Sequence, residues 1–163
     1  MNRLDKTNYY LDIAETVAER STCLRRRYGA IIVQEDEIVS TGYNGAPRGR
    51  ANCVDLGYCI RGKLGIPSGE RYELCRSVHA EANAIISASR RECLGAILYL
   101  ACRDPNNDAL IPGSSPCGMC RRLIINAGIS TVIVRDTPTE WHSYHVPDWI
   151  ADDDSILGED YTL

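Results

Sequence analysis

The sequence has no apolar run long enough to cross a lipid bilayer, and its first ten residues contain no apolar signal-peptide core. It also has no excess of positive charge, because 18 Lys and Arg are outnumbered by 22 Asp and Glu, for a formal net charge of -4. Proteins that bind nucleic acid usually present a basic surface. We therefore expect a cytoplasmic protein with neither a membrane nor a nucleic-acid partner.

Internal repeats and low-complexity segments are absent too, and 163 residues fit one domain with a sizeable core. Because helical patterns alternate with strand patterns in the second half, we expect parallel strand pairing there and a layered α/β sandwich. We expect one domain over 1–163, with a core of about 6–135 and a tail, 136–163, that packs through Trp141 and Trp149. Periodicity predicts helices over 6–20, 78–90 and 117–128, and strands over 28–33, 37–43, 95–102 and 129–134.

Residues 44–77 form a long aperiodic stretch that is rich in Gly, Pro, Arg and Cys. A loop of that length in a compact domain should be functional or held in place by something. The chain has eight cysteines, and in a reducing cytoplasm they are not expected to form a disulfide framework. Metal ligands, catalytic thiols and small buried apolar residues are the remaining interpretations.

Two short motifs carry the chemistry. Cys117 and Cys120 form a C-x-x-C at the start of a predicted helix, and His79 begins another predicted helix. Three ligands of this kind with a free fourth position are typical of catalytic Zn²⁺. Glu81, two residues after His79, can reach a metal-bound water and act in proton transfer. A C-x-x-C alone could be a redox motif or two core cysteines, but H-x-E followed by P-C-x-x-C is the signature of zinc deaminases.

The chain resembles the cytidine/deoxycytidylate deaminase superfamily, and within it most closely the deoxycytidylate (dCMP) branch. The segments that carry this resemblance are "ERSTCLRRRYGAIIV", "STGYNGAPRG", "CRSVHAEANAII" and "PCGMCRRLIINAGI". The resemblance implies a cytidine deaminase-like three-layer α/β/α sandwich with a mixed five-stranded sheet. It also implies hydrolysis of dCMP to dUMP and ammonia, in which zinc-bound hydroxide attacks C4 and Glu81 shuttles the proton.

The resemblance further implies nucleotide contacts at the "GYNG" motif. Asn44 matches a position that contacts the sugar, and Tyr43 and Gly45 belong to the same motif, which this branch links to activation by dCTP and inhibition by dTTP. Members are often homo-hexamers. From the residues themselves, arginines suit a phosphate-bearing ligand, although a solvated helix end explains any one of them equally well. The candidates for substrate or effector phosphate are Arg25, Arg26, Arg27, Arg48 and Arg50.

Six cysteines lie outside the C-x-x-C pair. A structural zinc held by four of them would fix the long loop, and some members of the branch carry a second zinc at positions resembling two of the four, Cys23 and Cys53. The alternative is four free thiols. The candidate ligands are Cys23, Cys53, Cys59 and Cys75, whereas Cys93 and Cys102 are interpreted as core residues.

The sequence departs from the dCMP branch in two places. Residues 103–115, "RDPNNDALIPGSS", are an insertion beside the expected pocket, and Val134 and Pro138 stand where tyrosines are expected. A deaminase of another small aminated base, nucleoside or nucleotide therefore stays open. A non-catalytic zinc module is disfavoured by Glu81, and an RNA-editing deaminase by the pI of about 5.4. We expect a surface or packing role for His142 and His145.

Overall fold

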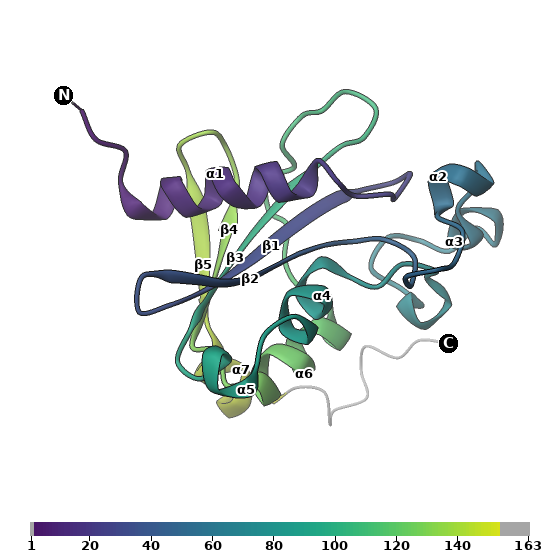
Figure 1. The fold of residues 1–163 in the computed structure, drawn as a ribbon. Helices are drawn as coiled ribbons and strands as arrows, with labels where there is room; N and C mark the ends of the chain where they lie inside the picture. Colours follow the sequence, from purple (N-terminus) through teal and green to yellow (C-terminus); the bar gives the residue numbers. More distant parts are fainter. Residues whose placement is uncertain (1, 154–163) are drawn as a thin grey trace.

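Five strands form one sheet in the computed structural model, which describes residues 2–153 (Figure 1). The strand order is β2-β1-β3-β4-β5; β3 and β4 are parallel, and all other neighbours are antiparallel. The mixed five-stranded sheet and the parallel pairing in the second half are thus confirmed. The strands are β1 (Arg27–Gln34), β2 (Glu37–Tyr43), β3 (Ile97–Arg103), β4 (Thr131–Arg135) and β5 (Trp141–His145).

Helices cover both faces of this sheet and complete the α/β/α sandwich. Helix α1 (Lys6–Ala18) lies on one face, and α4 (Ala80–Ile86) and α6 (Gly118–Ala127) lie on the other (Figure 1). Successive strand residues point to opposite faces. Accordingly Ile31 joins the core cluster under α1, whereas Ile32 joins the cluster under α4 and α6.

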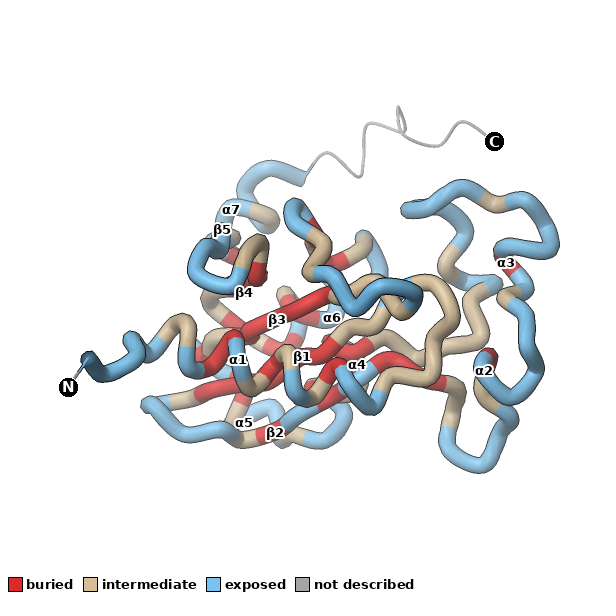
Figure 2. Tube along the Cα trace, turned by 90° about the horizontal axis from the view of Figure 1, so that it is seen from above, coloured by how far each residue is buried: buried red, intermediate tan, exposed pale blue. Residues whose placement is uncertain are grey.

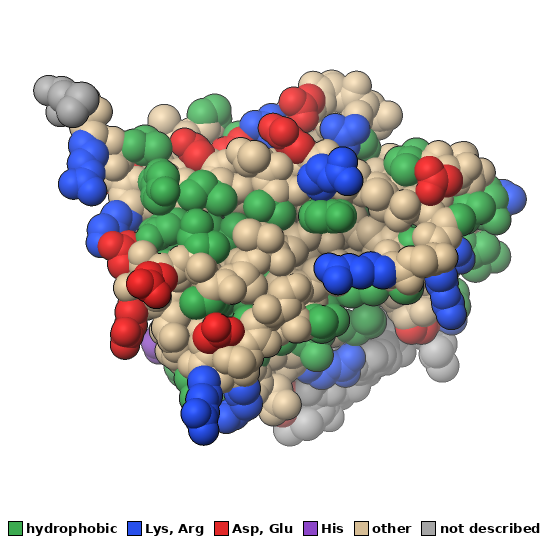
Figure 3. All heavy atoms as spheres, viewed as in Figure 1, with side chains coloured by type: hydrophobic (Ala, Val, Ile, Leu, Met, Phe, Trp, Pro, Cys, Tyr) green, Lys and Arg blue, Asp and Glu red, His purple; other side chains and the backbone are tan. Residues whose placement is uncertain are grey.

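Side chains of both charges are scattered over the surface seen in Figure 3.

A glycine lets α4 approach the sheet closely. A Cβ atom added at Gly42 in β2 would lie 2.3 Å from the Ala80 carbonyl oxygen and 2.4 Å from the Ala84 nitrogen. Any larger residue would push α4 away. Because α4 carries two of the residues predicted to do chemistry, Gly42 helps to set their position.

A buried arginine ties α1 to the sheet from the other side. Arg135 at the end of β4 is fully buried and forms ion pairs with Asp12 and with Glu15, the latter at 3.1 Å. It also donates to the side chain of Asn8. Glu15 in turn pairs with Arg103 at the end of β3. The apolar pattern of α1 predicted its buried face, but not this polar network beside it.

The predicted helix over 78–90 is two helices. Helix α4 ends at Ile86, and α5 (Arg90–Cys93) begins after a cap at Ser89. The Ser89 hydroxyl accepts from the Glu92 amide, and the Glu92 carboxylate accepts from the Ser89 amide. This reciprocal pair starts a new helix.

The segment after β4 adds to the sheet instead of forming a tail. Strand β5 pairs with β4, and α7 (Val146–Ala151) follows it; residues 154–163 of the predicted tail lie outside the described residues. Trp149 packs against the core as expected, but Trp141 is 42% exposed and does not. Strand β5 was missed because its residues alternate between exposed and half-buried positions and so give no apolar pattern.

The long loop contains three short helical turns and is held by an arginine. These turns are α2 (Cys53–Leu56), α3 (Ile60–Lys63) and the 3-10 turn η1 (Tyr72–Leu74). Helices α2 and α3 lie at the edge of the molecule (Figure 2). Arg61 in α3 is only 5% exposed. Its guanidinium donates to the carbonyls of Glu70 and Pro67 at 3.0 and 2.8 Å, and lies 4.2 Å from the ring centroid of Tyr72.

Within residues 2–153, no helix has the length and apolar character needed to span a membrane.

Candidate active site

The predicted metal ligands converge between two helix starts. His79 is the N-cap of α4, Cys117 is the N-cap of α6, and Cys120 lies in the first turn of α6. The His79 Nδ1 atom is 3.5 Å from the sulfur of Cys117 and 3.5 Å from that of Cys120. Tetrahedral zinc, with bonds of about 2.0 Å to nitrogen and about 2.3 Å to sulfur, requires ligand atoms about 3.5–3.8 Å apart. The three residues therefore fit a zinc ion.

The charges of this group also favour a metal. Contact with the Cys120 thiol lowers the pKa of Cys117 to about 4, against the effect of burial and with help from His79. Burial alone would lower the pKa of His79, but its contacts with the thiols of Cys117 and Cys75 raise it to about 10. A divalent cation that binds here displaces the protons shared by His79, Cys117 and Cys120.

Glu81 lies in the first turn of α4 and is 4% exposed. Burial raises the pKa of its carboxyl group above the ordinary value, and the neighbouring thiolate of Cys117 acts in the same direction. A carboxyl group with a raised pKa accepts a proton more readily than an ordinary one and can pass it on to a nearby base. This placement explains why a charged residue type stands at the start of an otherwise apolar helix.

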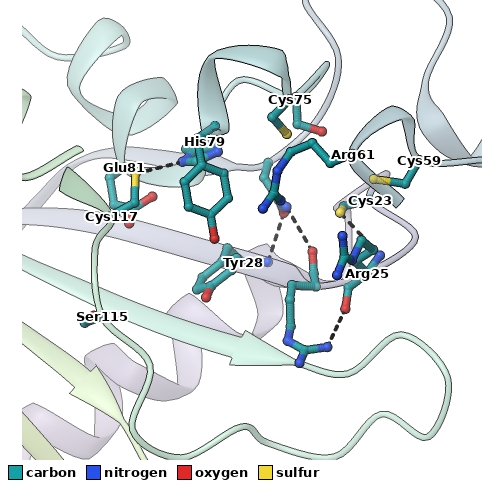
Figure 4. A pocket seen from close by; sticks show the side chains of 14 residues that line it. Cys23, Arg25, Tyr28, Cys59, Arg61, Cys75, His79, Glu81, Ser115 and Cys117 are labelled. Carbon is teal, nitrogen blue, oxygen red and sulfur yellow. Dashed lines mark hydrogen bonds between the residues drawn. The ribbon is translucent and has the colours of Figure 1, made fainter. Parts of the chain in front are cut away.

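A cavity of about 80 Å³ opens beside these residues (Figure 4). His79, Glu81 and Cys117 line one side of it, and Asn44 lines it as well. The Asn44 oxygen accepts from the Ser21 hydroxyl at 2.5 Å and from the Tyr28 amide at 2.9 Å, and its nitrogen donates to the Arg26 carbonyl at 2.9 Å. Asn44 is therefore held rigidly by the β1 entry loop, with one amide hydrogen left for a ligand.

The other predicted nucleotide contacts divide between this cavity and the surface. Arg25 and Arg26 line the cavity, whereas Arg48 is exposed and does not. Tyr43 is 38% exposed outside it. Gly45 makes a two-way backbone bridge to Val78, with N–O distances of 3.2 and 2.7 Å, which joins the "GYNG" motif to the segment before His79.

Five cavity residues were missed by sequence reasoning: Tyr28, Arg61, Tyr72, Ser77 and Ser115. Arg61 and Tyr72 come from the aperiodic loop, where no periodicity marked which side chains turn inward. Tyr72 contacts the His79 imidazole edge to face, with ring centroids 5.1 Å apart. Ser115 lies two residues before Cys117, and this proximity was the available signal.

The four cysteines proposed as a second zinc site do not form one here. Among the residues described, only His79, Cys117 and Cys120 bring three metal-ligating atoms within 4.8 Å of one another. Cys23, Cys59 and Cys75 line the catalytic cavity instead, and Cys53 is buried. The structure thus gives no support for a second zinc, and Arg61 contributes to holding the loop that the metal was expected to hold. Cys93 and Cys102 are buried, as predicted.

The insertion at 103–115 is anchored by His142. Its Nδ1 atom donates to the Asp136 carboxylate at 2.7 Å, and its Nε2 atom donates to the Ser114 carbonyl at 3.0 Å. Asp136 also accepts from the Gly113 amide at 2.7 Å. Gly113 and Ser114 lead directly into the P-C-x-x-C motif. Asp136 and His142 therefore fix the backbone just before Cys117. The packing role expected of His142 is therefore to hold the end of the insertion through Ser114.

Val134 and Pro138, which stand where tyrosines were expected, do not line the cavity. Val134 is fully buried in the core, and Pro138 is exposed in the turn before β5. Trp141 and Tyr144, which were considered as substitutes, do not line the cavity. Tyr144 packs against Trp149, with ring centroids 5.6 Å apart.

Comparisons with known proteins agree with this site. The family model described as "Cytidine and deoxycytidylate deaminase zinc-binding region" matches residues 4–136. The chain therefore belongs to the cytidine and deoxycytidylate deaminase family, and it is an enzyme of that family with a His-Cys-Cys zinc-binding group.

Several of the similar proteins are deoxycytidylate deaminases. Deoxycytidylate deaminase of Mycobacterium phage D29 is 37% identical over 137 residues, which are 82% of this chain and 96% of the relative. The Schizosaccharomyces pombe deoxycytidylate deaminase is 34% identical over 126 residues, 77% of this chain but only 35% of that longer relative. The solved dCMP deaminase of cyanophage S-TIM5, in complex with dCMP and dUMP, is 25% identical, with a TM-score of 0.56 and coverage of 83% and 85% of the two chains.

Proposed function

We propose that this protein converts dCMP and water to dUMP and ammonia. The observation that carries the proposal is the buried Glu81 carboxyl group beside the His79, Cys117 and Cys120 ligand group. A structural zinc site has no need of a buried acid next to its ligands. The named activities of the phage and yeast relatives support dCMP as the substrate.

The residues divide the work of the reaction. His79, Cys117 and Cys120 would hold zinc, which when bound supplies a Lewis acid that makes water a nucleophile at neutral pH. Glu81 takes a proton from the attacking water and gives it to N3 of the cytosine ring. Glu81 then passes the second water proton to the leaving amino group, so that ammonia departs and a C4 carbonyl remains.

The rigid amide of Asn44 is proposed to orient the sugar. Its position on the cavity wall and its remaining amide hydrogen support this role. The pocket must exclude other aminated compounds, since the zinc chemistry alone does not choose among them. Specificity therefore rests on the groups that surround the sugar and the phosphate.

We further propose that dCTP and dTTP regulate the enzyme and that it assembles as a hexamer, as the dCMP branch does. Tyr43 and Arg48 support a separate regulatory contact because both are exposed outside the cavity. Activity with and without each nucleotide, together with the mass in solution by light scattering, tests these two statements.

A substrate panel tests the activity itself. Ammonia release is measured for dCMP, CMP, deoxycytidine, cytosine and dCTP with the zinc-loaded protein. We expect the highest kcat/KM with dCMP. Preferred turnover of another cytosine compound would overturn the substrate assignment but keep the chemistry, and activity on an aminopurine alone would move the enzyme to another substrate class.

A further inference from the structure

Arginines gather on the side of the cavity away from Glu81. Arg25, Arg26 and Arg61 line it, and Glu81 is the one acidic lining residue. None of the three arginines forms an ion pair with a carboxylate within residues 2–153. Figure 4 shows Arg25 on the side of Cys23 and Cys59, opposite Glu81. Deamination at C4 gives no role to these charges.

Arg25 has an unmet requirement for a partner. Its Nη1 atom is buried and makes no hydrogen bond, and it is the only such side-chain nitrogen or oxygen in the described part of the chain. A buried cationic donor without an acceptor is costly, so native proteins rarely keep one unless a ligand, an ion or a water supplies the acceptor. An anion in the cavity would supply it.

Arg61 is held ready for the same anion. It is 5% exposed, and its Nε and Nη2 atoms donate to backbone carbonyls, which satisfy hydrogen bonds but carry no net charge. Its Nη1 atom makes no hydrogen bond to any described residue. Stacking on Tyr72 fixes the plane of the guanidinium. A guanidinium held in one orientation suits the oxygens of a phosphate group.

We propose that Arg25 and Arg61 form the anion-binding end of the catalytic cavity and hold the 5′-phosphate of the substrate. Arg26 stands at the rim, where it is exposed and donates to the Arg25 carbonyl. The inference rests on the proposed function insofar as the substrate is a nucleotide. A substrate phosphate and an effector phosphate share the same chemistry; the shared cavity with Glu81 assigns this site to the substrate.

The test compares a substrate with and without its phosphate. The kcat/KM ratio of dCMP to deoxycytidine is measured for the zinc-loaded wild type, Arg25→Leu and Arg61→Lys. Arg91→Leu on α5, an exposed arginine outside the cavity, is the matched control. Loss of a charge-assisted hydrogen bond predicts a ten- to hundredfold fall in this ratio for Arg25→Leu, mainly through KM, by the usual strength of such bonds. The Arg91 variant keeps the ratio.

Several results would overturn the proposal. One is an unchanged ratio in Arg25→Leu, and another is an equal fall in kcat/KM for dCMP and deoxycytidine, which indicates a purely structural role. Loss of dCTP stimulation with an unchanged ratio would assign the site to an effector. If no cytosine compound is turned over, the proposed function fails, and calorimetry with inorganic phosphate decides the inference. Binding that is at least tenfold weaker in Arg25→Leu supports it, and no binding by the wild type contradicts it.

Discussion

Replacement of Arg61 by Met should free the long loop while leaving the sheet intact. The change removes the donors to the Glu70 and Pro67 carbonyls and the stacking contact with Tyr72. Leaving a buried carbonyl unsatisfied costs about 1–3 kcal/mol, and a partly buried cation–π contact contributes about 1–2 kcal/mol. Because loop carbonyls can turn to water once the loop opens, the expected loss is about 2–4 kcal/mol of local stability.

Amide hydrogen exchange measures this effect directly. Protection of residues 61–75 should fall by about 30- to 1,000-fold, the ratio that corresponds to 2–4 kcal/mol. Strands β1 and β3 should keep their protection. Lys63→Met, an exposed cation in the same short helix that stacks on Tyr58, is the matched control and should leave the exchange of residues 61–75 unchanged.

The same experiment separates an arginine-held loop from a zinc-held loop. After removal of metal by a chelator, the wild-type loop should stay protected at Ile66 and Gly65, whose amides bond to Arg61 and Gly62 carbonyls. Exposure of the loop on chelation, together with unchanged protection in Arg61→Met, would show that a metal and not Arg61 holds the loop.

The zinc content should be one per chain by metal analysis, since a single three-ligand group forms within residues 2–153, and two per chain would show that the four other cysteines bind metal after all. Arg135→Met should lower the free energy of unfolding by about 2–4 kcal/mol in urea, because it removes the buried partner of Asp12 and Glu15. The figure is discounted because Asp12 is half-exposed and because Glu15 still pairs with Arg103. A double-mutant cycle with Glu15→Gln should give a coupling of about 1 kcal/mol or more, and additive effects would contradict the pairing.

The parts of the fold that the sequence predicts are those with a periodic apolar pattern. Helix α1 and strands β1 and β3 bury Leu11, Ile31 and Leu98 fully, and burial of this kind leaves a clear spacing in the sequence. Strand β5 leaves none, because its side chains stay half-buried or exposed and its pairing is made by the backbone. The apolar pattern continues past Ser89 and so predicted one helix. The chain forms two because the Ser89–Glu92 capping pair starts a new helix there.

The metal ligands were predictable because their chemistry restricts residue type and spacing together. His79 caps one helix, and Cys117 and Cys120 lie at the start of another; helix starts of this kind can be inferred from sequence. Arg61 was not predictable, because a buried arginine is defined by the carbonyls that surround it, and those belong to a loop without periodicity. The second zinc stays a prediction: burial raises the pKa of Cys53, and Cys23, Cys59 and Cys75 lie near enough to raise it further, but among the residues described the four do not form one tight ligand group.

Proton transfer by Glu81 can be tested by a single substitution. Ammonia release from dCMP is compared between the wild type and Glu81→Gln, each with its zinc content determined. We expect the variant to retain zinc, since Glu81 is not one of the three ligands, and to lose at least about 100-fold in kcat, the usual contribution of a general acid–base group. A zinc-loaded Glu81→Gln variant that deaminates dCMP at the wild-type rate would contradict the account.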